Sequence, residues 1–100
     1  MNKELITLKV AGTKFHEGIN EVQLMSDGDE LSMVPEPTNI YDKYAVKVLY
    51  NDLMLGYIPK IVSQVFSTLV QNGVHLEASI TKVNPNAPPH EMVTFTISLV

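Results

Sequence analysis

The chain has 100 residues and a formal net charge of −4, and all seven of its cationic side chains are lysines. A chain of this length forms a single domain, which we take to cover residues 1–100. The acidic balance and the absence of arginine exclude broad electrostatic wrapping of duplex nucleic acid, and the absence of cysteine excludes disulfides and thiolate metal sites.

The sequence predicts no targeting signal. No basic start precedes an apolar run of the length found in secretory signals. The longest uncharged stretch, residues 61–76, is too short and too often interrupted by polar side chains to span a bilayer. We therefore expect a cytoplasmic protein that does not contact membranes.

The first third of the chain predicts two strands with a long loop between them. Residues 5–10 are rich in β-forming side chains that partly alternate, and they predict the first strand. Residues 13–28 contain glycines, turn pairs and few apolar side chains, so we expect a loop with one short element. Residues 30–34 predict a second strand, which ends at Pro35 and Pro37 because proline has no N–H to donate.

A hairpin follows an ordered loop at residues 37–42. Residues 45–50 and 53–58 predict its two strands, and Asn51-Asp52 occupies the position of a tight turn. Pro59 ends the second of these strands and suits the start of a helix.

Helical spacing begins after that proline. Apolar side chains recur every three to four residues as one broad stripe, made of Ile61, Val62, Val65, Phe66, Leu69 and Val70. Asn72-Gly73 then supplies the left-handed stop that ends many helices. The pattern predicts one helix, and its stripe is typical of a face that packs on a core.

Two more strands complete the chain, at residues 76–81 and 93–99, with a proline-rich loop at residues 84–89 between them. Clean alternation and short connections favour a mainly β, α+β fold. We expect an antiparallel, partly closed barrel of about six strands with one or two helices, one of which plugs an end.

Polar groups that a core does not need gather in three segments: residues 12–16, 36–43 and 56–60. Each segment lies at the end of a predicted strand, so we expect all three to meet at one rim of the barrel.

The side chains of these segments complement a nucleic-acid end. Phe15, Tyr41 and Tyr57 offer flat faces on which an unpaired base can stack. Lys14 and Lys60 offer charge to a phosphate.

Two polar side chains add hydrogen-bonding capacity. Asn39 can donate and accept along a base edge, whereas Asp42 repels a phosphate but accepts a hydrogen bond from a sugar hydroxyl. In the plainer interpretation, Asn39 and Asp42 are ordinary turn residues that bond their own backbone, the tyrosines border the core and the lysines are solvated. Composition and spacing leave both interpretations open.

The same segments resemble the HIRAN domain family. The family pattern is a VxG start, an EPxNxYDxxAIxV centre and a GYIPK-like junction between a strand and a helix. Its order and spacing hold over residues 9–99. The matching stretches here are Val10-Ala11-Gly12-Thr13-Lys14-Phe15, Glu36-Pro37-Thr38-Asn39-Ile40-Tyr41-Asp42-Lys43-Tyr44-Ala45-Val46-Lys47-Val48 and Leu55-Gly56-Tyr57-Ile58-Pro59-Lys60.

The resemblance implies a six-stranded, OB-like barrel with helices. It also implies binding of single-stranded DNA at a free 3′-hydroxyl end. In the family, the domain is usually attached to SNF2-type helicases of replication-fork repair or to nucleases. Four residues match the family's binding positions directly: Asn39, Tyr41, Asp42 and Lys60. The resemblance implies that Asp42 accepts a hydrogen bond from the terminal hydroxyl and that Tyr41 stacks on the terminal base. Lys14 and Phe15 stand where the family has an Arg-Tyr pair.

Three departures from the family pattern bear on affinity. Pro35 stands where arginine is common, and Lys14 lacks the fork with which arginine grips a phosphate. Residues 84–91 also lack the aromatic side chain of the DNA-binding relatives. We expect weaker DNA binding than in the helicase-attached members.

The residues give little support to an enzyme. Asp42 and Glu36 are too few carboxylates for a Mg²⁺-dependent nuclease, and His16, His75 and His90 have no metal-ligand spacing. The sequence has no phosphate-binding loop of the ATPase kind. We expect no catalytic site, no metal and no cofactor.

The alternative is a protein-interaction domain that keeps the fold but has lost DNA affinity. The acidic charge favours it, and the strand at residues 93–100 offers an edge for pairing if no neighbour covers it. A helicase or nuclease acting in trans is the expected protein partner, and the sequence leaves the oligomeric state open.

Overall fold

The computed structural model describes residues 2–100, which form six strands, one α-helix and three short 3-10 helices. The strands are β1 (Lys3–Lys9), β2 (Glu30–Pro35), β3 (Val46–Tyr50), β4 (Leu53–Tyr57), β5 (Leu76–Val83) and β6 (Val93–Leu99). The helices are η1 (Thr13–Phe15), η2 (Glu17–Leu24), α1 (Lys60–Gln71) and η3 (Pro89–Glu91). Every predicted strand is therefore present, with small shifts at its ends.

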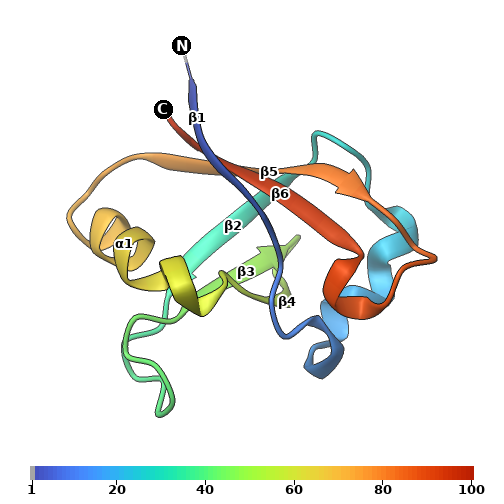
Figure 1. Ribbon diagram of the computed structural model, residues 1–100, viewed down its shortest axis with the longest axis horizontal. Coiled ribbons are helices and arrows are strands. Elements are labelled where there is room, and N and C mark those ends of the chain that lie inside the picture. Colours follow the sequence, from blue (N-terminus) through green and yellow to red (C-terminus); the bar gives the residue numbers. More distant parts are fainter. Residues whose placement is uncertain (1) are drawn as a thin grey trace.

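The strands form one antiparallel sheet in the order β1-β6-β5-β2-β3-β4, and the sheet curls into a partly open barrel (Figure 1). Its two ends meet beyond β1, where the N–H groups of Ala11 and Tyr57 each donate to the other's carbonyl oxygen at 2.9 Å. Gly56 permits this approach, because a Cβ there would collide with the carbonyl oxygen of Ala11. The predicted fold class is confirmed.

The last strand lies inside the sheet. β6 pairs with β1 on one side and with β5 on the other, so residues 93–99 offer no free edge, and the condition for pairing with another chain there is not met. Alternation along a strand tells which side chains face the core, but the neighbours of that strand are set by contacts distant in the sequence.

The core fills the inside of the barrel with the inward-facing side chains of the strands. In β3, Val46, Val48 and Tyr50 are buried and alternate with half-buried neighbours. Phe95 and Ile97 of β6 have no exposed surface. Burial of each such large apolar side chain stabilises the fold by about 1.5–3 kcal/mol.

The β3–β4 hairpin turns at the predicted pair. Asn51 and Asp52 have φ angles of 47° and 68°, both in the left-handed region. Two such residues form a turn whose twist matches that of the flanking strands, and the short polar side chains of Asn and Asp tolerate this conformation better than most.

Residues 13–28 are more ordered than predicted, because η1 and η2 occupy most of them. Gly18 and Val22 of η2 are buried. A Cβ at Gly18 would collide with the backbone of Met54, so the glycine allows η2 to lie directly against β4. This packing is tertiary, and the turn-rich composition of the segment does not reveal it.

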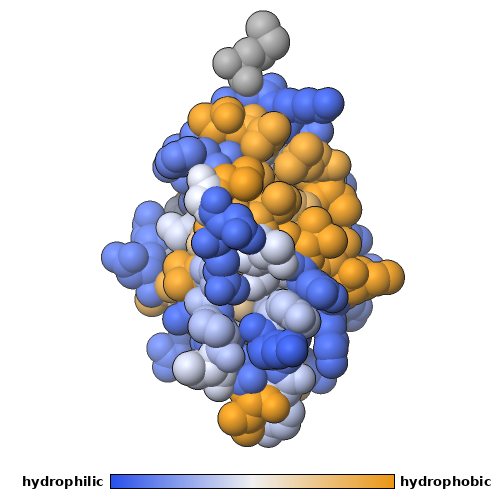
Figure 2. Space-filling model, turned by 90° about the vertical axis from the view of Figure 1, so that its left-hand side faces the viewer, coloured by the Kyte–Doolittle hydropathy of each residue, from blue (hydrophilic) through white to orange (hydrophobic). Residues whose placement is uncertain are grey.

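The helix α1 is where predicted, but only part of the predicted apolar stripe packs on the core. Phe66 is buried as expected, whereas Ile61 is 91% exposed and Val65 is 57% exposed. Ser63 and Ser67 also lie on the packed side, where small side chains let the helix approach its neighbours closely. Figure 2 faces the α1 side of the molecule and shows hydrophobic surface beside hydrophilic side chains. Among residues 2–100, no helix is long and apolar enough to cross a membrane.

Candidate functional site

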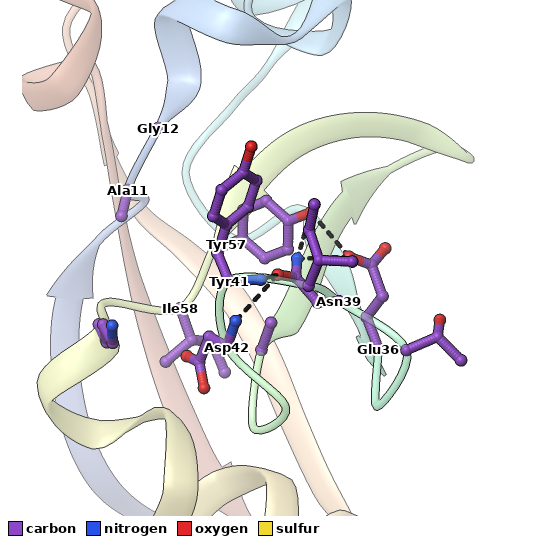
Figure 3. A pocket seen from close by; sticks show the side chains of 12 residues that line it. Ala11, Gly12, Glu36, Asn39, Tyr41, Asp42, Tyr57 and Ile58 are labelled. Atoms are coloured by element: carbon purple, nitrogen blue, oxygen red, sulfur yellow. Dashed lines mark hydrogen bonds between the residues drawn. The ribbon is translucent and has the colours of Figure 1, made fainter.

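A pocket of about 600 Å³ opens outside the barrel, where the three polar segments meet (Figure 3). The end of β1, the loop after β2 and the junction between β4 and α1 each supply part of its wall. The lining residues are Ala11, Gly12, Glu36, Thr38, Asn39, Ile40, Tyr41, Asp42, Ala45, Tyr57, Ile58 and Lys60. The expectation that the three segments share one rim is confirmed.

Five of the predicted binding residues line this pocket and two do not. Lys14 and Phe15 lie on η1 beside it, where the Lys14 ammonium is 5.0 Å from the centre of the Phe15 ring. Phe15 is 75% exposed, so its ring is accessible next to the pocket and not within it. The DNA contacts assigned to all seven residues stay predictions.

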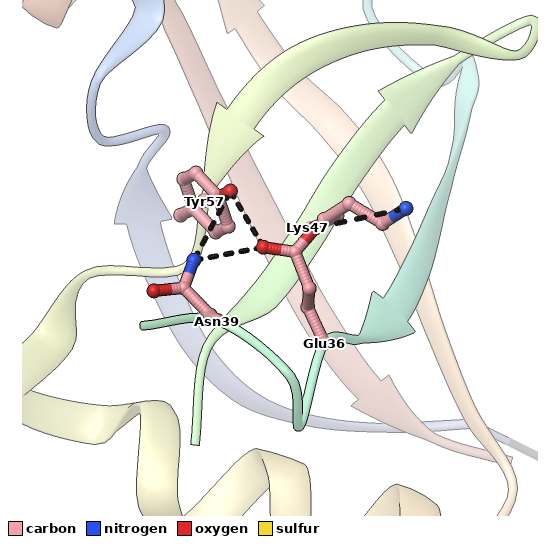
Figure 4. A network of polar contacts seen from close by, with 4 residues as sticks. All are labelled: Glu36, Asn39, Lys47 and Tyr57. Carbon is pink, nitrogen blue, oxygen red and sulfur yellow. Dashed lines mark hydrogen bonds and ion pairs between the residues drawn. The ribbon is translucent and has the colours of Figure 1, made fainter. Parts of the chain in front are cut away.

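Asn39 holds the pocket loop in shape. Its Oδ1 accepts hydrogen bonds from the backbone N–H groups of Tyr41 at 2.8 Å and Asp42 at 3.0 Å. Its Nδ2 donates to Glu36 Oε1 at 2.8 Å and lies 3.4 Å from the Tyr57 hydroxyl (Figure 4). The side chain therefore uses its full bonding capacity within the protein, and this geometry favours the turn interpretation over the reading of a base edge.

Glu36 is the centre of the same network. The Tyr57 hydroxyl donates to its Oε1 at 2.9 Å, and Lys47 Nζ lies 3.8 Å from its Oε2. The hydrogen bond from Asn39 lowers the pKa of Glu36, and the Tyr57 hydroxyl and the Lys47 charge act in the same direction against the effect of burial. Burial, followed by the bond to Glu36, raises the pKa of Tyr57. Glu36 is therefore a carboxylate and Tyr57 a neutral phenol at neutral pH.

Asp42 is anchored on both of its oxygens. Oδ1 accepts from the backbone N–H of Tyr44 at 2.9 Å, and Oδ2 accepts from Ser63 Oγ at 3.1 Å. Ser63 is only 2% exposed and connects the loop to α1. Because a carboxylate oxygen accepts about two hydrogen bonds, Asp42 keeps acceptor capacity for a group in the pocket.

The pocket combines apolar walls with an acidic charge balance. The carboxylates of Glu36 and Asp42 face one ammonium, that of Lys60, among its lining residues. The rings of Tyr41 and Tyr57 add flat surface, and Tyr41 is 84% exposed. Such a pocket suits a flat, largely apolar group that carries a hydroxyl and disfavours a phosphate, which two carboxylates repel.

Two residues of this site escape sequence reasoning. Glu36 belongs to a predicted polar segment but is given no role there beyond that of a weak metal ligand, and Ser63 is given no role. The sequence feature that could have indicated Ser63 is its position among the apolar residues of the predicted helix, where a hydroxyl on the packed face needs a hydrogen-bond partner. Within residues 2–100, no group of three or more His, Cys, Asp or Glu side chains is arranged to hold a metal ion.

Six antiparallel strands in a partly open barrel, with a loop pocket at the rim, define a mainly β, OB-like domain. The HIRAN domain model matches residues 3–100, and the chain belongs to the HIRAN domain family.

Two plant proteins are similar to the chain over most of its length, and both are named Fanconi-associated nuclease 1 homolog. The protein of Arabidopsis thaliana is 36% identical over 84 residues, which make up 82% of this chain and 9% of the relative. The protein of Oryza sativa subsp. japonica is 30% identical over 73 residues, 69% of this chain and 7% of the relative. The chain therefore spans less than a tenth of the length of either protein.

Two crystal structures share the fold. A protein from Lactobacillus plantarum superposes with a TM-score of 0.84 at 21% identity, over 99% of this chain and 95% of that one. The HIRAN domain of human HLTF superposes with a TM-score of 0.74 at 16% identity, over 98% of this chain and 78% of that one. At such low identities the likeness shows the fold alone.

Proposed function

We propose that this domain binds single-stranded DNA, preferentially at a free 3′-hydroxyl end, without catalysing a reaction, and that it acts in the cytoplasm in DNA repair or replication. The observation that carries this proposal is the pocket itself, in which aromatic and apolar walls surround the anchored carboxylate of Asp42.

The proposed binding mode gives each wall a task. A terminal base stacks on Tyr41 or Tyr57, and stacking on an aromatic side chain contributes about 1–3 kcal/mol per base. Asp42 accepts a hydrogen bond from the terminal 3′-hydroxyl. Lys60 contacts the phosphate that links the last two nucleotides, since it is the ammonium among the lining residues.

The preference for a hydroxyl follows from charge. A 3′-phosphate in the same place would lie against the carboxylates of Asp42 and Glu36, whereas a hydroxyl gains a hydrogen bond to a charged acceptor. Hydrogen bonds to charged groups contribute about 1.5–3 kcal/mol, so we expect at least about tenfold tighter binding of a 3′-hydroxyl end.

The family and its members support this assignment in outline. The HLTF structure is a HIRAN domain, and the plant relatives carry nuclease names, so we propose a helicase or nuclease as the partner in trans. Because the chain matches less than a tenth of those nucleases, we assign no cleavage activity to it. Incubation of the protein with oligonucleotides and Mg²⁺ should leave the DNA intact, and metal-dependent cleavage would contradict this.

The test is fluorescence anisotropy with short oligonucleotides that end in a 3′-hydroxyl or a 3′-phosphate, at low and at moderate salt. Tighter binding of the hydroxyl end is expected. Equal affinities would contradict end recognition, and no binding at low salt would contradict DNA binding altogether. That last result would favour a protein-interaction domain, for which the exposed apolar side chains of Ile61 and Val65 on α1 offer a surface.

A further inference from the structure

A second hollow, of about 270 Å³, lies on the outer surface of β1, β6 and β5. Its lining residues are Lys9, Lys82, Asn84, Ala87, Glu91, Met92 and Thr94. Thr94 of β6 is paired with Lys9 of β1 and with Lys82 of β5, so the two lysines flank it from the neighbouring strands. None of these residues belongs to the pocket described above.

The charge of this hollow is opposite to that of the pocket. Two ammonium groups face one carboxylate, that of Glu91, which lies 3.9 Å from Lys9 Nζ. Both partners of this ion pair are about half exposed, at 53% and 46% of their side chains, and such pairs contribute little. Lys82 forms no ion pair within residues 2–100. The hydroxyl of Thr94 and the amide of Asn84 add hydrogen-bond donors, so the hollow suits an anion.

The two sites share one face of the same segment. Ala11 lines the pocket and Lys9 lines the hollow, while Val10 between them is buried in the core. Alternate residues of an extended chain point to the same side and lie roughly 7 Å apart, so the sites are neighbours along the outer face of β1. The hydrogen bond of 2.6 Å from Thr13 Oγ1 to the Pro89 carbonyl ties η1 to η3, which borders the hollow.

We propose that Lys9 and Lys82 bind the phosphates of a DNA strand whose 3′ end occupies the pocket, so that the hollow is the path along which the backbone leaves. The inference rests on the proposed function and extends it from one terminal nucleotide to the strand behind it. A passing phosphate takes the place of Glu91 as the partner of Lys9. Because the pocket is acidic, this path supplies much of the attraction that the pocket lacks.

The first test compares Lys9→Gln and Lys82→Gln with Lys3→Gln, a matched loss of charge at the far end of β1. The probes are oligothymidylates of two and of about ten nucleotides with 3′-hydroxyl ends, the first shorter than the footprint of a single OB fold and the second within its range of about 4–16 nucleotides. Each of the first two variants should weaken binding of the longer strand several-fold and reduce its salt slope by about 0.7, with the dinucleotide unaffected. Lys3→Gln should change neither. If all three variants behave alike, or if the dinucleotide weakens as much as the longer strand, the path is wrong while the pocket stands.

The second test uses a closed circular oligonucleotide of thymidine, which has no end. At low salt it should shift the amide NMR signals of Lys82, Asn84 and Thr94. Such shifts, together with equal affinity for 3′-hydroxyl and 3′-phosphate ends, would show that the hollow binds phosphates. They would also show that the bound strand does not have its 3′ end in the pocket, which would overturn the proposed path. Absence of shifts, with end preference intact, would overturn the path alone. A protein that binds no DNA would overturn both.

Discussion

The pocket at the rim and the hollow between Lys9 and Lys82 are neighbours on the same surface but present different chemistry. The pocket has apolar and aromatic walls, two carboxylates and one lysine. The hollow has two lysines, one glutamate and neutral donors. If the proposed functions hold, this contrast explains how a chain of net charge −4 binds a polyanion, because recognition of a terminal nucleoside is separated from attraction of the phosphates that precede it.

We expect the largest effect from a substitution at Asn39, which tests whether its hydrogen bonds hold the pocket loop in shape. Asn39→Ala removes the side chain that bonds Tyr41, Asp42 and Glu36. At about 1 kcal/mol per hydrogen bond, we expect a loss of about 2–3 kcal/mol in the free energy of unfolding and a fall in Tm of roughly 8–24 °C. Thermal unfolding followed by circular dichroism measures this.

The matched control for that change is Asn86→Ala, an exposed loop asparagine whose side chain forms no hydrogen bond within residues 2–100. It should leave Tm nearly unchanged. An equal, small effect of both substitutions would mean that the Asn39 network does not hold the loop.

The next effect separates the two kinds of recognition within the pocket. Asp42→Asn keeps a side-chain oxygen for the Tyr44 N–H but removes the charge, so the preference for a 3′-hydroxyl over a 3′-phosphate should fall about tenfold. Lys60→Gln should instead weaken both oligonucleotides alike. Anisotropy titrations read both, and the reverse pattern would refute the two roles.

A smaller effect is expected from Ser63→Ala, which frees one oxygen of Asp42 from its contact with α1. We infer that Ser63 positions Asp42, so the end preference should fall a few-fold. Ser67→Ala removes an equally buried hydroxyl one turn further along, which bonds Gln71 instead. Both changes should lower stability by about 1 kcal/mol, but only the first should alter the end preference. Equal preferences in the two variants would exclude positioning.

The smallest effect concerns pH. Because the pKa of Glu36 is lowered from 4.5, its ionised form stabilises the folded state above that pH, and the contribution disappears as the pH falls through the lowered value. The difference in Tm between the wild type and Glu36→Gln should therefore be constant near neutrality and should shrink below pH 4.5. Circular dichroism melts across this range check it. A difference that does not vary with pH would show that the charge of Glu36 is irrelevant.

Features governed by neighbours in the sequence are predicted well. The Asn51-Asp52 turn depends on the backbone preferences of those two residues, and β6 on its own alternation. The neighbours of β6 and the packing of η2 on β4 are not predicted, because both depend on contacts between distant segments.

The site follows the same rule. The three segments are recognisable because their motifs are local and resemble a known family. The packed face of α1 is predicted only in part: hydrophobic periodicity also selects Ile61 and Val65, which are exposed, and it does not reveal the polar contact that joins Ser63 to a residue 21 positions earlier. The internal bonds of Asn39 likewise become visible only once Glu36 and Tyr57 are placed beside it.

The pair of backbone hydrogen bonds between Ala11 and Tyr57, which closes the barrel, also has a consequence for ligand binding. Tyr57 closes the barrel with its backbone and holds the pocket loop through Glu36 with its hydroxyl, while Ala11 opposite it is part of the pocket wall. A molecule bound in the pocket therefore contacts both sides of the place where the two ends of the sheet meet. Because the bound molecule stabilises the closed arrangement of these two segments, its binding opposes their local opening. Hydrogen exchange at the backbone amides of Ala11 and Tyr57 should therefore slow more than exchange elsewhere in the sheet.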